Sequence, residues 1–261
     1  MAAAAERASS AWAQGSLKIA SPLAVLLVWE AASRLGLANA LVLPPPSLVF
    51  ASLVESLLHG TLLFDIAVSC ARLVAGFLAG TLLGLAVGMA MVARRTVGDV
   101  LDVLVALVYP IPKVAILPLL LIWFGTGEAT RMIVIATGAF FPVVVNLYAA
   151  AKEVDPVLIR AARNLGAGNR QVLRQVVLPA ILPAFYAGAI LGASLALVLL
   201  VYAEMTAAES GVGYFTFTAA SLFEPEQAFA GVFTLGVMGW LWHRLIVAAQ
   251  AWHCPWQRRG R

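Results

Sequence analysis

Ionisable residues inside apolar stretches are the positions where this sequence could carry out chemistry. Each one costs roughly 2.5–3.5 kcal/mol at the centre of a membrane-spanning helix, so it invites a functional hypothesis. Five such residues lie in or at the edges of apolar segments: Asp65, Arg72, Lys113, Arg131 and Glu204. Two interpretations are open. The side chains line a path for a solute, or they only pair within the protein and reach toward the aqueous interface.

The first interpretation predicts a translocation path that includes Arg72, Lys113 and Glu204. Lys113 gives it a physical reason, because this residue stands between Pro112 and Pro118. Interrupted helices are where membrane proteins expose backbone and charge to a water-filled path. A lysine there would draw in an anion.

The sequence gives no support for a catalytic, metal-binding or nucleotide-binding site. The three histidines, His59, His243 and His253, are scattered, and no nucleophile or metal-ligand constellation accompanies them. The chain lacks the Gly-x-x-x-x-Gly-Lys-Ser/Thr pattern of a nucleotide-binding loop. We therefore predict no catalytic, cofactor-binding or metal-binding residue.

Composition places the chain in a bilayer. Of its 261 residues, 62% are hydrophobic and 11% are charged, against about 25% charged in a soluble domain. The net charge of +4 would suggest nucleic acid in a soluble protein. Here the basic residues cluster between apolar stretches, so membrane topology explains them and no nucleic-acid partner is expected.

Six stretches are long enough to span a membrane, which needs about 20 apolar residues. The expected fold class is therefore all-α, a polytopic membrane protein. The six are Leu17–Leu37, Phe64–Val92, Val100–Phe124, Arg131–Ala151, Val177–Ala203 and Phe229–Ala249. Prolines interrupt the third, which should bend or split.

Lys and Arg gather in the segments that a cytoplasmic N-terminus would place inside. Most of the 17 basic residues lie in the N-terminus, near Arg94, in 152–174 and in the C-terminal tail. Segments 38–63 and 204–227, which would lie outside, contain none. This pattern predicts that both termini are cytoplasmic. The predicted regions are a cytoplasmic N-terminus (1–16), a transmembrane domain (17–251) and a basic cytoplasmic tail (252–261).

The second span carries four glycines at a spacing of four residues: Gly76, Gly80, Gly84 and Gly88. This spacing puts them on one helical face. Since helices in lipid associate through close packing of small residues, we predict a tight helix–helix seam here.

A loop of about 152–176 before the fifth span is the most informative stretch. Asp155-Pro156 is typical of a helix start, and Gly166 of a helix end. Asn169 could cap a second short helix, and Pro179 and Pro183 follow near the start of the fifth span. The loop is therefore predicted to be a helix–turn–helix at the cytoplasmic end of the membrane. A loop that only binds anionic lipid headgroups is the alternative.

Residues 160–179 resemble the loop signature of bacterial ABC importer permeases. That signature reads Glu-Ala-Ala, three residues, Gly, nine residues, Ile, one residue, Leu-Pro. The matching residues are Ala161, Ala162, Gly166, Leu178 and Pro179. Arg160 stands where the family has Glu, which reverses a charge, and Val176 stands in place of Ile.

Further motifs narrow the resemblance to the nitrate/sulfonate/taurine-type permeases and extend it over nearly the whole chain. They include Ser69-Cys-Ala-Arg72, Trp123-Phe-Gly-Thr-Gly-Glu128, Ala203-Glu204-Met205 and Gly211-Val-Gly213-Tyr214, besides Leu43-Pro-Pro-Pro-Ser. For Ser210–Phe215, a plain loop and a role beside a gate are equally open.

The resemblance implies a type I ABC importer permease fold in a bacterial inner membrane. It implies a homodimer of permeases, a cytoplasmic ATPase dimer that binds ATP, and an extracytoplasmic binding protein that delivers a small solute such as a sulfonate, taurine or nitrate. Loop 160–179 would then couple the permease to the ATPase. A secondary transporter without an ATPase is the alternative, and a membrane enzyme is a second. No mid-span carboxylate or internal repeat favours the former.

Overall fold

The structure is a computed structural model that describes residues 20–37, 39 and 41–256. The predicted N-terminal region 1–16 and the end of the tail lie outside these residues. The first predicted span, Leu17–Leu37, begins outside them as well, and residues 20–34 of it are helical.

Helices form the regular structure of the described part of the chain. Four helices there are long and apolar enough to cross a membrane: α3 (Leu62–Ala93), α6 (Glu128–Lys152), the run Asn169–Ala207, and α11 (Pro225–His253). The all-α, multi-span fold class is confirmed. The expected count of six spans is not, since these residues give four spans, or five if one broken pair counts as a span.

The broken pair is the third predicted span. It consists of α4 (Arg95–Val108), the 3-10 turn η1 (Lys113–Ile116) and α5 (Leu117–Phe124), and its two parts meet at 87°. Pro110 and Pro112 lie in the break. Each lacks a backbone N–H and cannot continue the helical ladder, so the predicted break is confirmed.

The chain divides into two compact units, and the first contains the described residues up to Leu63 together with Phe215–Phe233. Its short helix α2 (Pro46–Leu58) begins with proline at the first helical position, where no hydrogen bond is lost. The Glu30 carboxylate accepts hydrogen bonds from the Ser47 N–H at 3.0 Å and the Ser47 hydroxyl at 2.7 Å. These bonds join helix 20–34 to the start of α2.

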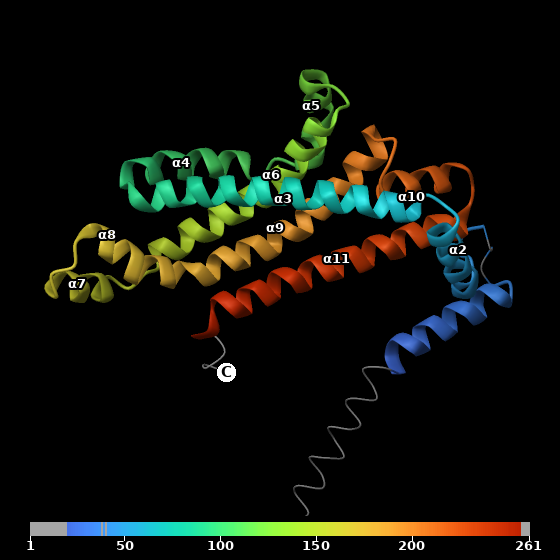
Figure 1. Cartoon of the computed structure of the whole chain (residues 1–261), viewed down its shortest axis with the longest axis horizontal. Coiled ribbons are helices and arrows are strands. Elements are labelled where there is room, and N and C mark those ends of the chain that lie inside the picture. Colours follow the sequence, from blue (N-terminus) through green and yellow to red (C-terminus); the bar gives the residue numbers. More distant parts are fainter. Residues whose placement is uncertain (1–19, 38, 40, 257–261) are drawn as a thin grey trace, which may run out of the picture. The chain divides into compact units, whose positions relative to one another are not determined.

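The second unit contains Phe64–Tyr214 and the described residues from Thr234 onward. Within it α3, α6 and α9 (Leu178–Ala207) run side by side (Figure 1). Its core is drawn mainly from these helices and includes Phe77, Ile135, Ala139, Val143, Leu147, Ala193, Ala196 and Leu200. Alanines and glycines between α6 and α9 let the two helices approach closely, as packing in lipid requires.

The four glycines of α3 face α6. A Cβ added at Gly80 would meet the carbonyl oxygen of Ala136, and one at Gly76 or Gly84 would lie 2.7 or 2.8 Å from an α6 atom. At Gly88 the nearest atom is 3.5 Å away, an ordinary contact. Backbone packing between α3 and α6 is therefore tightest at Gly80 and looser toward Gly88.

Candidate functional site

The segment predicted to couple the permease to an ATPase forms two short helices, α7 (Pro156–Asn164) and α8 (Asn169–Val172). The Asp155 carboxylate caps α7 by accepting the Val157 N–H at 2.7 Å. Gly166 follows the end of α7 with φ +87°. Its N–H donates to the Arg163 carbonyl, and the Ala167 N–H donates to the Ala162 carbonyl, which is the Schellman arrangement for ending a helix.

The second short helix differs in detail from the prediction. Gly168, rather than Asn169, is its N-cap residue, and the Gly168 N–H donates to the Gln171 side chain at 3.0 Å. Between α8 and α9 lies one π-helical turn, Leu173–Val177. It ends next to Leu178 and Pro179, the first two residues of α9. Pro179 lacks a donor and crowds the preceding turn, which accounts for the wider coil.

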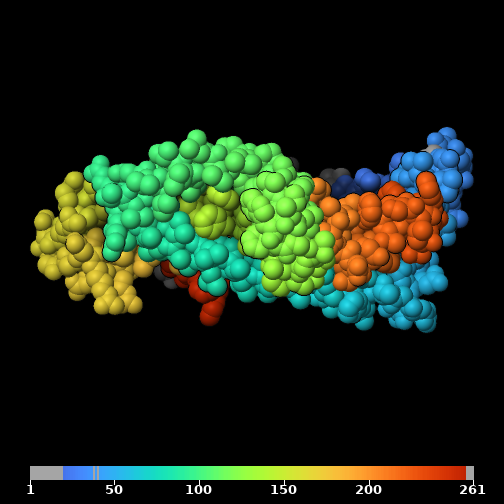
Figure 2. Space-filling view, turned by 90° about the horizontal axis from the view of Figure 1, so that it is seen from above, coloured from blue at the N-terminus to red at the C-terminus, as the bar shows by residue number. Residues whose placement is uncertain are grey.

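The α7–α8 segment presents apolar side chains to its surroundings. Leu165 is 89% exposed and Leu158 is 53% exposed, while Arg160 and Ala161 are also exposed and Ala162 is half-buried. Figure 2 shows this segment, in yellow, at one end of the second unit. An exposed apolar face beside charged residues is typical of a surface that binds another protein.

A charge network, buried except at Glu128, lies near the other end of α9. Nε and Nη2 of Arg72 donate to the two carboxylate oxygens of Glu128 at 2.8 and 2.6 Å. Nη1 of Arg72 donates to Glu204 Oε1 at 2.9 Å and to the Ser210 carbonyl at 2.6 Å. Arg131 donates to Glu128 at 2.6 Å and to the Ala207 carbonyl. The two guanidinium groups balance the two carboxylates, and each has hydrogen-bond partners, as buried charges require.

Glu204 is the most enclosed member of this network. Its side chain is 0% exposed, and besides Arg72 it accepts from the Ser69 hydroxyl at 2.8 Å and the Gly213 N–H at 2.9 Å. A Cβ on Gly211, whose φ is +113°, would collide with this carboxylate. Glycine at 211 is therefore needed for both the backbone conformation and the space.

The turn before α10 (Val212–Ser221) is held by side chains of α3 and α9. Three consecutive backbone N–H groups donate to these side chains. The Gly211 N–H donates to Asp65 at 2.7 Å and the Val212 N–H to Ser69 at 2.9 Å. The Gly213 N–H donates to Glu204. They are donors of the kind that a helix start leaves without intrahelical partners. Ser210 and Gly211 thus form a hydrogen-bonded turn, and residues 212–215 are the first residues of α10. A role beside a gate stays a prediction.

A polar cavity of about 480 Å³ lies beside the network. We call it the polar cavity, and its lining residues are Arg72, Thr126, Glu128, Arg131, Thr206, Ala207, Ala208, Glu209 and Ser210. Arg72, predicted to line the path, borders this cavity, whereas Glu204 is buried behind it.

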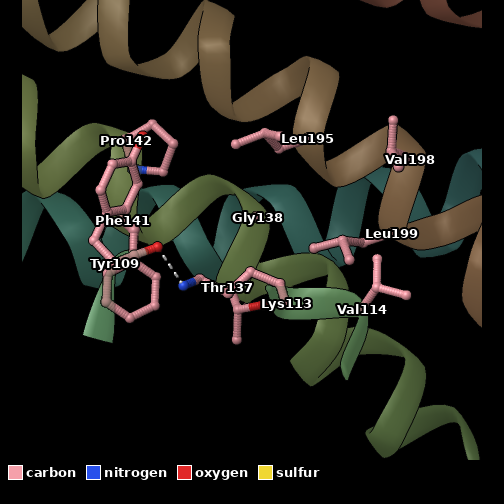
Figure 3. Close-up of a pocket in the computed structure, with 10 residues that line it drawn as sticks. All are labelled: Tyr109, Lys113, Val114, Thr137, Gly138, Phe141, Pro142, Leu195, Val198 and Leu199. Atoms are coloured by element: carbon pink, nitrogen blue, oxygen red, sulfur yellow. Dashed lines mark hydrogen bonds between the residues drawn. The ribbon is translucent and has the colours of Figure 1, made fainter. Parts of the chain in front are cut away.

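Lys113, the third predicted path residue, lies elsewhere, at the break between α4 and α5. Its ammonium group donates to the carbonyl oxygens of Val108, Tyr109 and Ile111, each at 2.9 Å, and lies 4.3 Å from the centre of the Phe141 ring. Figure 3 shows it beside a small cavity of about 120 Å³, lined mostly by apolar residues of α6 and α9. All three N–H donors of Lys113 are therefore occupied by backbone.

The sequence did not single out Glu128, Ser69 and Ser210 as site residues. A signal for Glu128 and Ser69 was present, because each lies in one of the short motifs that carry the resemblance. Four of these motifs supply the residues of the network: Ser69 with Arg72, Glu128, Glu204, and Gly211 with Gly213. The structure brings all four motifs into one hydrogen-bonded network.

Comparison with known proteins agrees with this geometry. Residues 80–259 match the family described as binding-protein-dependent transport system inner membrane component. The chain belongs to this family. Among curated relatives of the chain, the taurine transport system permease protein TauC of Escherichia coli strain K12 is 34% identical over 93% of this chain and 90% of its own length. The putative aliphatic sulfonates transport permease protein SsuC of Bacillus subtilis strain 168 is 33% identical over 87% of this chain and 82% of its own length.

Solved structures support the permease fold of the chain. A chain of the MetNI methionine ABC transporter, in an inward-facing conformation, matches with a TM-score of 0.53 at 21% identity. The match covers 72% of this chain and 95% of that one. The fold is accordingly that of an ABC transporter permease. The apolar helices make the chain a multi-pass membrane protein, and the family matched by residues 80–259 implies an ATPase partner and a binding protein.

Proposed function

We propose that this inner membrane component forms the translocation path of an ATP-driven importer for small sulfonates, including taurine. Family membership over residues 80–259 is the observation that carries this proposal. The names of the TauC and SsuC relatives support the solute class. A secondary transporter is not favoured, because such a protein needs no exposed segment of the kind formed by α7 and α8.

The ATPase dimer would bind the α7–α8 segment and hold ATP itself. The contact would use exposed apolar side chains, Leu158 and Leu165 among them. Arg160, which replaces the glutamate of the family signature, is exposed on α7, where it would meet the ATPase surface. The Schellman turn at Gly166 fixes the angle between the two helices.

The remaining features of the assembly are proposed from the family resemblance and, for the termini, from the distribution of Lys and Arg. Two copies of the chain would form a homodimer in a bacterial inner membrane, with the path between them and both termini in the cytoplasm. Cysteines placed singly at Asn169 and Glu226 in a cysteine-free variant should then react with impermeant reagents from opposite sides of sealed vesicles. Reaction of both from one side contradicts this orientation.

Copurification tests the proposal. The tagged chain, expressed with the ATPase encoded beside it, should retain that ATPase through detergent purification, and the binding protein with taurine should stimulate its ATP hydrolysis. A chain that carries out solute uptake without any ATPase would overturn the proposal in favour of a secondary transporter.

A further inference from the structure

Arg131 has unused hydrogen-bond donors in the wall of the polar cavity. An arginine has five N–H donors, and Arg131 uses one on Glu128 and one on the Ala207 carbonyl. Its Nε is enclosed and has no partner among the described residues, so the donors left for the cavity are the second N–H groups of Nη1 and Nη2. Arg72 differs, because all five of its N–H groups are engaged with Glu128, Glu204 and Ser210.

Hydroxyl groups surround the cavity with further polar partners. Ser210 Oγ accepts from Arg72 at 3.2 Å, which leaves its own proton to donate. Thr206 Oγ1 donates to the Tyr202 carbonyl at 2.8 Å, so it can still accept. Thr126 also lines the cavity. A guanidinium group with spare donors beside hydroxyl donors is the chemistry that binds sulfonate, carboxylate or phosphate oxygens.

Charge balance restricts which anion can enter. Arg72 and Arg131 are already neutralised by Glu128 and Glu204, and Glu209 adds an exposed carboxylate to the lining. A simple anion would therefore add a second uncompensated negative charge to the cavity. A zwitterion would not, since its cationic group can lie near Glu209 while its oxyanion accepts from Arg131.

The volume is sufficient for a small solute. A water molecule takes up about 30 Å³ of liquid, so a cavity of about 480 Å³ can hold a molecule of several heavy atoms with part of its hydration shell.

We infer that the polar cavity is a subsite for a small zwitterion that carries an oxyanion and an ammonium group, of which an aminoalkanesulfonate is the simplest example. Arg131 binds the oxyanion and Glu209 attracts the ammonium group. This inference rests on the proposed function, and it separates aminosulfonates from plain alkanesulfonates as preferred solutes.

Direct binding tests the subsite. The complex of the chain with its ATPase, in nanodiscs and without the binding protein, is titrated with taurine and with ethanesulfonate, which lacks the amino group. The wild type should bind taurine more tightly. Glu209→Gln should weaken taurine binding roughly two- to five-fold and leave ethanesulfonate unchanged, whereas Arg131→Lys should weaken both ligands. Glu55→Gln, which removes an exposed carboxylate of α2, is the matched control.

The outcomes separate the two proposals. An unchanged ratio of the two affinities in Glu209→Gln overturns the subsite, and so do unchanged affinities in Arg131→Lys. If the buried Arg131 variant fails to assemble, the exposed Glu209 variant decides the question alone. ATP-driven uptake of both sulfonates with no effect of Glu209→Gln removes the subsite and leaves the proposed function intact. A wild-type complex that transports neither compound contradicts the proposed solute class.

Discussion

At the scale of single residues, Glu204 joins α3, α9 and the turn before α10. Its carboxylate is fully buried and accepts from Arg72, Ser69 and the Gly213 N–H. Glu204→Gln would leave Arg72 with Glu128 as its one ionic partner in the network. We expect the variant to lose about 3 kcal/mol of stability, because Arg72 and Arg131 would then share the single carboxylate of Glu128 and the network would carry an uncompensated positive charge.

Thermal unfolding of the detergent-solubilised protein measures this loss. The matched control is Glu55→Gln, which alters an exposed carboxylate and should leave the unfolding temperature near that of the wild type. Equal unfolding temperatures for Glu204→Gln and wild type would show that the network contributes no net stability.

Lys113 gives a second prediction at this scale. Its ammonium group holds the carbonyl oxygens of Val108, Tyr109 and Ile111 at the point where the helical ladder of α4 ends. Lys113→Gln should lower stability by about 1–3 kcal/mol, as expected when backbone acceptors lose a charged donor. If stability stays the same and uptake alone slows, Lys113 acts on the solute, as the sequence predicts.

At the scale of helices, the α3–α6 seam allows a matched comparison within one helix. Gly80→Ala would push a methyl group into the Ala136 backbone, while Gly88→Ala meets its nearest atom at 3.5 Å. Overpacking costs typically 1–3 kcal/mol, and Gly-to-Ala alone favours a helix. Unfolding temperatures should therefore fall for Gly80→Ala and hold or rise for Gly88→Ala. Equal behaviour of the two variants would contradict the close packing of α3 on α6.

The α7–α8 turn offers a similar comparison. Gly166 has φ +87° with open space around it, and Gly168, two residues later, has φ −72°. Gly166→Ala should cost roughly 1–2 kcal/mol through backbone conformation alone, whereas Gly168→Ala should not. We expect Gly166→Ala to insert normally but to retain less ATPase on copurification. If both variants retain it equally, the geometry of this turn is not needed for coupling.

The elements were more predictable than their contacts. Apolar runs located α3, α6, α9 and α11 to within a few residues, because a span must fill a fixed thickness of hydrocarbon. Proline predicted the break between α4 and α5 for an equally local reason.

The charge network could not be derived in this way. Arg72 lies 56 positions from Glu128 and 132 from Glu204 along the chain, so pairing depends on how three helices pack. The sequence predicted that Arg72 and Glu204 are candidate residues of the translocation path, and it left Glu128 without a role. Lys113 was likewise placed correctly in the break, while its three carbonyl partners depend on the direction in which α4 ends.

At the scale of the whole molecule, α9 connects the two regions that carry the account. It begins beside the α7–α8 segment and reaches Glu204 after 26 residues, roughly 40 Å at 1.5 Å per residue. A displacement of the α7–α8 segment would therefore reach the charge network and the polar cavity through one continuous helix. This arrangement suits a permease whose path is opened and closed by ATP binding in a partner.

Solute uptake by reconstituted vesicles tests that central claim most directly. Proteoliposomes containing the chain and its ATPase, with ATP enclosed at the ATPase side and the binding protein on the other, should accumulate radiolabelled taurine. Uptake should stop when ATP is replaced by a non-hydrolysable analogue. Accumulation that continues without hydrolysable ATP and follows an imposed ion gradient would contradict the account.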